Sequence, residues 1–208
     1  MCKQKGRTFC SELGMDVSLW STTAPLSKPE WINKEYQDFS ESLNFLKEGN
    51  LDCSKSKLAN SADQKMRLWF HEHAQNSGVW RHKTFRIPAP LPLLPLDKNK
   101  NFKKYEEEIF ARDNLKCGYC SSKLFPKRVF KEFQASLGPE LFPLGKTNES
   151  RSGFYLMFVA TLDHVLPWSV GGRTDESNLI TSCWSCNYGK ANFTVEQLGI
   201  SNPLAHPQ

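Results

Sequence analysis

Apolar residues recur at helical spacing in several segments of an otherwise polar chain. The first such segment covers residues 30–47. A second helix is predicted to begin at Asp63, as its N-cap, and to end at Gly78. Two more are expected at 102–114 and at 127–137, the last ended by Gly138 and Pro139. The expected apolar faces comprise Trp31, Tyr36, Phe39, Leu43, Leu46, Met66, Leu68, Trp69, Phe70, Tyr105, Ile109, Phe110, Val129, Phe130, Phe133 and Leu137.

The C-terminal third changes to a strand pattern. Residues 154–165 are rich in aromatic and β-branched side chains, which favours a strand, and a second strand is expected at 179–181. A short helix should follow at 184–192, and Thr194 could cap one more turn before Gly199. Helices followed by a hairpin indicate the α+β class.

A proline-rich stretch separates two parts of the chain. Residues 87–95 carry four prolines, each of which fixes φ and removes a backbone donor, so this stretch is predicted to be a stiff linker. The predicted organisation is a mainly helical N-terminal region at 1–87, a linker at 88–100 and a second domain at 101–208. A length of 208 residues allows either one domain with an extension or two small domains.

Composition narrows the class further. No apolar run approaches the roughly 20 residues that cross a bilayer, and the chain does not start with an apolar signal stretch, so a cytoplasmic protein without membrane contact is expected. The net charge of +5 is mildly basic. Residues 51–100 hold most of the excess, with nine Lys or Arg against four Asp or Glu.

Four of the seven cysteines form two C-x-x-C pairs, Cys117 with Cys120 and Cys183 with Cys186. Two such knuckles supply the four sulfurs of a tetrahedral structural zinc site. The alternatives are a redox C-x-x-C motif and buried free thiols. The two pairs lie far apart in sequence, so a zinc ion would pin together the ends of an inserted unit.

The segment from Leu162 to Gly172, followed by Asn178-Leu179 and by 183–190, resembles the HNH endonuclease motif. The resemblance covers about residues 105–203. It implies a C-terminal, zinc-stabilised ββα-metal domain and an H-N-N variant of the motif, formed by His164, Asn178 and Asn187 with Asp163 beside the histidine. The 121–160 insertion, where simpler members have a short hairpin, departs from the family pattern.

The resemblance assigns a role to each of these side chains. His164 would be the general base, because its ordinary pKa near 6.5 suits proton abstraction at neutral pH. Asp163 and Asn187 would bind one catalytic Mg²⁺ or Mn²⁺ ion, which prefers oxygen ligands. Adjacent strand residues face opposite ways, so a bend or bulge is expected between Asp163 and His164. Asn178 would hold the loop of the histidine, although an Asn there could also be an ordinary turn residue.

Basic residues outside the motif suggest how nucleic acid would be bound. Arg81, Lys83 and Arg86 lie among aromatic residues, a composition that suits phosphate contacts and base stacking, but a solvated helix face over an aromatic core is an equal alternative. Lys190, one turn after Asn187, is a candidate phosphate contact or a solvated lysine.

The predicted function is a metal-dependent endonuclease that hydrolyses DNA, of a restriction or defence type acting on duplex DNA in a prokaryote or phage. A homodimer would allow both strands to be cut, although the sequence shows no interface. The alternatives are a low-specificity or nicking HNH nuclease of a mobile element, a non-catalytic zinc DNA-binding module, and a ribonuclease.

Overall fold

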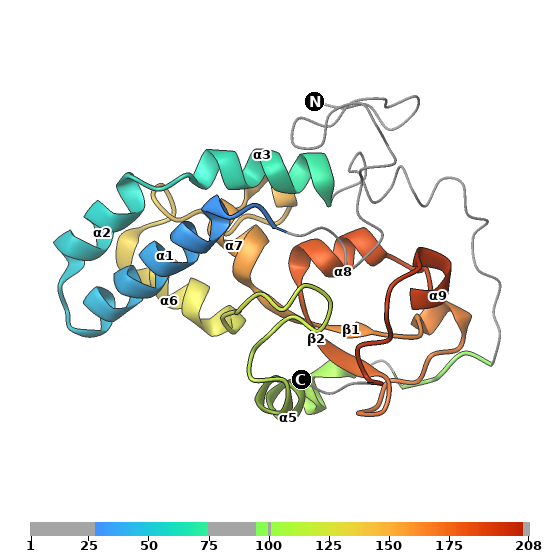
Figure 1. Ribbon diagram of the computed structural model, residues 1–208. Helices are drawn as coiled ribbons and strands as arrows, with labels where there is room; N and C mark the ends of the chain where they lie inside the picture. The colour runs from blue at the N-terminus through green and yellow to red at the C-terminus, as the bar shows by residue number, and fades with distance from the viewer. Residues whose placement is uncertain (1–27, 75–94, 100, 206–208) are drawn as a thin grey trace.

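The computed structural model describes residues 28–74, 95–99 and 101–205 (Figure 1). The predicted linker at 88–100 and the end of the second predicted helix at Gly78 fall largely or wholly outside these residues. The elements, in chain order, are α1 (Trp31–Lys47), α2 (Leu51–Ala59), α3 (Asp63–His73), η2 (Phe102–Lys104), α5 (Glu106–Arg112), α6 (Lys127–Leu137), η3 (Asn148–Ser150), α7 (Gly153–Phe158), β1 (Ala160–His164), η4 (Trp168–Val170), β2 (Leu179–Cys183), α8 (Trp184–Lys190) and α9 (Val195–Leu198). The fold is mixed α+β, with helices first and a hairpin plus helix near the C-terminal end, as the sequence predicts.

The hairpin of β1 and β2 is the only sheet among the described residues. Its antiparallel register runs from Ala160 opposite Cys183 to His164 opposite Leu179, and every residue of β1 has one partner. Helix α5 packs on one face of the hairpin, and α8, which follows β2 directly, packs on the other (Figure 1). Each side chain of β1 therefore faces either α5 or α8, according to its place in the alternation.

An aromatic core joins the N-terminal helices to the rest of the molecule. Phe39 of α1 is fully buried, and its ring lies 4.6–5.9 Å from five other phenylalanine rings. Those partners come from the 121–160 segment: Phe125, Phe130, Phe133, Phe142 and Phe154. Residues on both sides of the predicted linker thus contribute to one core.

The stretch predicted as a strand over 154–165 forms two elements, and this expectation was wrong for its first half. Helix α7 occupies 153–158, and β1 begins only at Ala160. All six residues of α7 are buried, so the helix is apolar all round and has no polar face to reveal its period. The Ser152 hydroxyl caps the helix by accepting from the Phe154 N–H at 3.2 Å.

Asp63 was expected to cap its own helix, but it is the first residue of α3, after Ala62 as N-cap. Its carboxylate reaches across to the start of α7, where it accepts hydrogen bonds from the Ser152 hydroxyl and the Gly153 N–H, both at 2.7 Å. The two helices approach closely because Gly153 has no side chain: a Cβ there would lie 2.4 Å from the Asp63 carbonyl oxygen. Leu68, predicted on the apolar face, is instead exposed.

Candidate functional site

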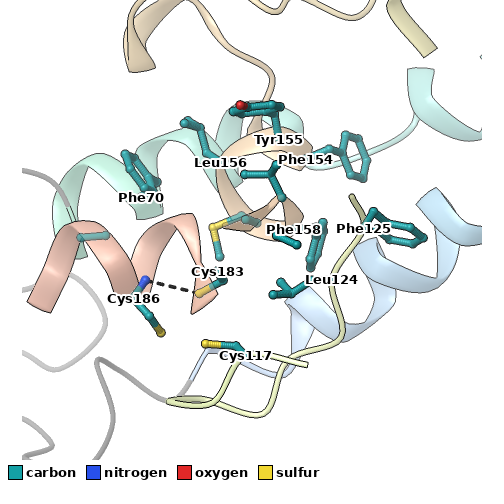
Figure 2. Close-up of a cluster of buried hydrophobic side chains, with 14 of the residues drawn as sticks. Phe70, Cys117, Leu124, Phe125, Phe154, Tyr155, Leu156, Phe158, Cys183 and Cys186 are labelled. Atoms are coloured by element: carbon teal, nitrogen blue, oxygen red, sulfur yellow. Dashed lines mark hydrogen bonds between the residues drawn. The ribbon is translucent and has the colours of Figure 1, made fainter. Parts of the chain in front are cut away.

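The four cysteines of the two C-x-x-C pairs come together beneath the aromatic core. Their sulfur atoms all lie within 4.8 Å of one another. Cys117, Cys183 and Cys186 are buried, and the Cys183 sulfur accepts from the Cys186 N–H at 3.3 Å, as the N-cap of α8 (Figure 2). Each knuckle is therefore a tight turn that presents two sulfurs to the same point.

This donor set fits a structural zinc ion. Four cysteine sulfurs in a closed, buried cluster match the tetrahedral sites that zinc occupies in folded domains. The Cys120 and Cys183 sulfurs are 3.9 Å apart, which is far longer than the roughly 2.05 Å of a disulfide bond. The spacing therefore favours zinc binding over a disulfide between the knuckles.

Lys28 places a positive charge beside the sulfurs. Its ammonium donates to the Met157 carbonyl oxygen at 2.8 Å. Burial alone lowers the pKa of Lys28, but the negative charge of the four cysteines outweighs it and raises the pKa overall. The sequence gives no sign of this contact, because Lys28 lies far from both knuckles along the chain.

On the α8 face of β1, the Asp163 carboxylate is held by two buried side chains. The Tyr119 hydroxyl, from within the first knuckle, donates to Oδ2 at 2.7 Å, and the Lys190 ammonium lies 3.2 Å from the same oxygen. Burial and the nearby Asp163 charge raise the pKa of Tyr119 well above its ordinary value, so the phenol stays protonated. The described residues provide no hydrogen bond to the other carboxylate oxygen.

Lys190, predicted as a candidate phosphate contact, is not accessible to a phosphate in this structure. The residue is completely buried, and its ammonium donates to the His164 carbonyl oxygen at 2.8 Å besides pairing with Asp163. A lysine is seldom fully buried unless it is paired. Its place is thus inside the fold, where it links α8 to β1.

His164 lies on the opposite face of β1. The bend or bulge expected between Asp163 and His164 is absent, because both residues keep their one-to-one partners on β2. The imidazole edge contacts the Phe102 ring, with centroids 4.8 Å apart, and Nε2 lies 3.0 Å from the Thr174 hydroxyl. Burial is the main cause that lowers the pKa of His164 below 6.5. The ring is therefore neutral at pH 7.

The partners of Thr174 define which nitrogen of His164 carries the proton. The Thr174 hydroxyl donates its single proton to the Asn99 carbonyl oxygen at 2.7 Å. It can then only accept from His164, so Nε2 is the donor and Nδ1 keeps the lone pair. The hydrogen-bond network thus prepares Nδ1 as the basic atom.

Asn178 ties together the loop that follows β1. Its amide oxygen accepts from the Leu166 N–H at 2.8 Å, and its amide nitrogen donates to the carbonyl oxygens of Leu166 and Arg173, both at 2.9 Å. These three bonds span the turn between His164 and β2, the position that the sequence resemblance gives to this asparagine. An ordinary turn asparagine would not need to bridge both ends of the loop.

Asn187 reaches from α8 to β1. Its amide nitrogen lies 3.3 Å from the Thr161 hydroxyl and donates to the Leu162 carbonyl oxygen at 3.2 Å. No described residue donates to its amide oxygen. Thr161 and Asp163 share a face of β1, and Asn187 of α8 reaches that face. One carboxylate oxygen of Asp163 and the amide oxygen of Asn187 thus both lack a hydrogen-bond donor among the described residues.

Of the candidate site residues predicted from the sequence, Asp163, His164, Asn178, Asn187 and Lys190 all gather around β1. The candidate DNA contacts Arg81, Lys83 and Arg86 lie outside the described residues. The sequence analysis missed Tyr119 and Thr174. Tyr119 has one local signal, its position between two metal-binding cysteines, whereas Thr174 has none.

Comparison with known protein families gives one match. The family model described as HNH endonuclease matches residues 158–193, which span β1, the following loop, β2 and α8. No curated protein and no solved structure gave a significant match to the chain. Residues 158–193 therefore match an HNH endonuclease domain, and a four-cysteine cluster of the zinc-knuckle kind accompanies the match.

Among the residues described, no helix is both long and apolar enough to cross a membrane.

Proposed function

We propose that this protein is a metal-dependent endonuclease that hydrolyses phosphodiester bonds of DNA. The observation that carries the proposal is the arrangement around β1, within the HNH match. His164 at the end of the strand is neutral, with Nδ1 as its basic nitrogen. One oxygen each of Asp163 and Asn187 receives no hydrogen bond from the described residues. These are the residue types that such hydrolysis needs, namely a base for water and ligands for a divalent cation.

In this mechanism His164 acts as the general base. Nδ1 takes a proton from the attacking water, while the Nε2–H bond to Thr174 keeps the ring in place and supports the imidazolium that forms. Because the pKa of His164 is lowered, the ring is unprotonated at Nδ1 at neutral pH and can accept a proton from water.

Asp163 and Asn187 are the residues that would hold a catalytic Mg²⁺ or Mn²⁺ ion. Carboxylate and amide oxygens suit these hard cations, and both oxygens are free of hydrogen bonds from the described residues. The bound ion would supply positive charge for the phosphate as negative charge develops there. Tyr119 and Lys190 fix Oδ2 of Asp163, which leaves the other oxygen for the ion.

The finer proposal is a restriction-type or defence nuclease that cuts duplex DNA, working as a homodimer when both strands are cut. Arg81, Lys83 and Arg86 would add contacts to DNA. The zinc site would be purely structural, because four sulfur ligands leave it no open position for water.

The test is digestion of supercoiled plasmid DNA in Mg²⁺ or Mn²⁺, with a matched RNA as second substrate. We expect wild-type protein to nick or linearise the plasmid and His164→Ala to lose about 10² to 10⁴ in rate, the usual contribution of a general base. Linear product would support cleavage of both strands, and sequenced ends would give the cut position. A folded, zinc-loaded protein that cuts no DNA, or cuts only RNA, would contradict the proposal.

The metal ligands need a separate measurement. Asn187→Ala should raise the Mg²⁺ concentration at half-maximal rate and be partly rescued by more Mg²⁺ or by Mn²⁺. Asn33→Ala, the same substitution on the exposed face of α1, serves as the matched control. Identical metal titrations for Asn187→Ala and wild type would show that Asn187 is not a ligand.

A further inference from the structure

A groove runs beside β1, next to the proposed catalytic residues. It has a volume of about 230 Å³, and we call it the β1 groove. Residues 159–162 of β1 and of the position before it line the groove, together with Phe102, Lys103, Lys127, Arg151 and Trp184, among others. These five side chains come from η2, α6, the segment after η3 and the start of α8, which are far apart in sequence.

The β1 groove adjoins both halves of the candidate active site. Phe102, at one end, contacts the His164 ring, with centroids 4.8 Å apart. Thr161 and Leu162, which also line it, are the two residues to which the Asn187 amide donates. A chain lying in the groove would therefore be separated from the proposed base only by Phe102, and from the proposed ligand Asn187 only by Thr161 and Leu162.

The groove is positively charged. Lys103, Lys127 and Arg151 line it, against the single acidic residue Glu106. The ammonium groups of Lys103 and Lys127 have no ion-pair partner among the described residues, and both side chains are at least partly accessible to solvent. They are free to neutralise a negatively charged ligand.

Arg151 differs from the two lysines because its guanidinium is already fixed. The guanidinium donates to the carbonyl oxygens of Gly145 and Lys146 at 3.0 and 3.2 Å. Its central carbon, Cζ, lies 5.2 Å from the Tyr155 ring centroid and 5.5 Å from the Trp184 ring centroid. Arg151 adds a stationary charge to the groove. We therefore assign the adaptable phosphate contacts to Lys103 and Lys127 alone.

We propose that the DNA strand to be cut lies in the β1 groove, with Lys103 and Lys127 contacting phosphates next to the scissile one. The inference rests on the proposed function for the identity of the ligand. It goes further by assigning substrate binding to η2 and to α6 of the 121–160 insertion, both outside the HNH match. Repeated negative charge is what two unpaired ammonium groups along one groove would recognise.

The experiment measures binding of a labelled DNA duplex across a salt series, without added divalent ion, in the His164→Ala background. Each neutralised phosphate contributes about 0.9 to the slope of log affinity against log salt. The double substitution Lys103→Ala with Lys127→Ala should therefore flatten the slope by about 1.8 and weaken binding most at low salt. Non-specific binding is sufficient for this readout, so no recognition sequence needs to be known.

The matched control is Lys47→Ala with Lys55→Ala, which removes the same charge from the end of α1 and from α2. Figure 1 places these helices away from β1. The control should leave the slope nearly unchanged. If both double variants flatten the slope equally, or if neither does while melting temperature and zinc content match wild type, the β1 groove does not bind DNA.

The design separates this inference from the proposed function. Cleavage by wild type together with an unchanged binding slope would overturn the groove and leave the nuclease proposal standing. Salt-dependent binding through Lys103 and Lys127 in a protein that never cuts DNA would support the groove and overturn the nuclease proposal.

Discussion

The two faces of β1 differ in what surrounds the candidate site residues Asp163 and His164. On the α8 face, Asp163 is closed in by Tyr119 and Lys190, and both of these side chains are buried. On the other face, His164 contacts Phe102, which is exposed and borders the β1 groove. Asp163 is thus held in place by buried side chains, whereas His164 adjoins a surface that is open to solvent.

The orientation of the Asp163 carboxylate and the protonation of the His164 ring therefore depend on different neighbours, although the two residues are consecutive. The hydroxyl of Tyr119 orients the carboxylate, and the hydroxyl of Thr174 orients the imidazole. Substitutions on the buried face should change metal binding and folding, whereas substitutions near His164 should change the rate and its pH dependence. The predictions that follow test this separation.

The largest effect is expected from Cys183→Ser. Cys183 belongs to the four-cysteine cluster that fits zinc, and it is also the N-cap of α8 and the last residue of β2. Its replacement should therefore remove metal binding energy that is also folding energy. We expect the variant to lose zinc by elemental analysis and to lose its cooperative thermal transition. Cys53→Ser, at an exposed cysteine outside the cluster, is the control and should retain both. Wild-type zinc content and melting in Cys183→Ser would refute the structural zinc site.

A smaller effect is expected from Tyr119→Phe. The variant keeps the ring in the core but removes the hydrogen bond to Oδ2 of Asp163, so the carboxylate is oriented by Lys190 alone. Loss of a partner that orients a metal ligand commonly costs about 10- to 100-fold in metal affinity. We expect Mn²⁺ binding, measured by calorimetry on zinc-loaded protein, to weaken within that range.

Tyr36→Phe is the matched control for this substitution, because Tyr36 packs on Phe125 and Phe158 in the aromatic core rather than beside Asp163. Its Mn²⁺ affinity should equal that of wild type. A drop in melting temperature without any change in Mn²⁺ affinity would mean that Tyr119 only stabilises the fold, and the proposed coupling between the knuckle and Asp163 would be wrong.

Elements with local signals could be predicted from the sequence. Helix α6 begins after Pro126 and ends before Gly138, and its bounds match the prediction at 127–137 because both its period and its end signal are local. The Thr194 cap before Gly199 was also correct, with a capping box formed by Gln197. Helix α7 was missed because burial on all sides removes the amphipathic period, and α2 was not predicted.

For the candidate site, the motif residues could be predicted from the sequence, but their hydrogen-bond partners could not. The residues of the HNH motif lie in one short stretch of the sequence at a recognisable spacing, so Asp163, His164, Asn178 and Asn187 could be chosen before the structure was known. Their partners could not, since Tyr119 and Asp163 are 44 positions apart and only the fold brings them together. The burial of Lys190 also depends on the fold, because the sequence does not show that the His164 carbonyl oxygen would accept a hydrogen bond from its ammonium group.

The smallest effect, and the sharpest test of the separation, is expected from Thr174→Val. This variant keeps the shape but removes two hydrogen bonds, the one accepted from His164 Nε2–H and the one donated to the Asn99 carbonyl oxygen. The first of these, worth about 1 kcal/mol, corresponds to roughly fivefold in rate. The imidazolium loses more than the neutral ring, so the already lowered pKa of His164 should fall further. A base must be unprotonated to act, hence activity rises with pH through this pKa, and the rising limb, below pH 6.5 in wild type, should move to still lower pH. The measurement is the pH profile of plasmid cleavage at saturating Mg²⁺, with Thr174→Ser expected to restore both rate and profile. A changed Mn²⁺ affinity with an unmoved pH profile would show that Thr174 acts on the metal ligands and that the two faces of β1 are not independent.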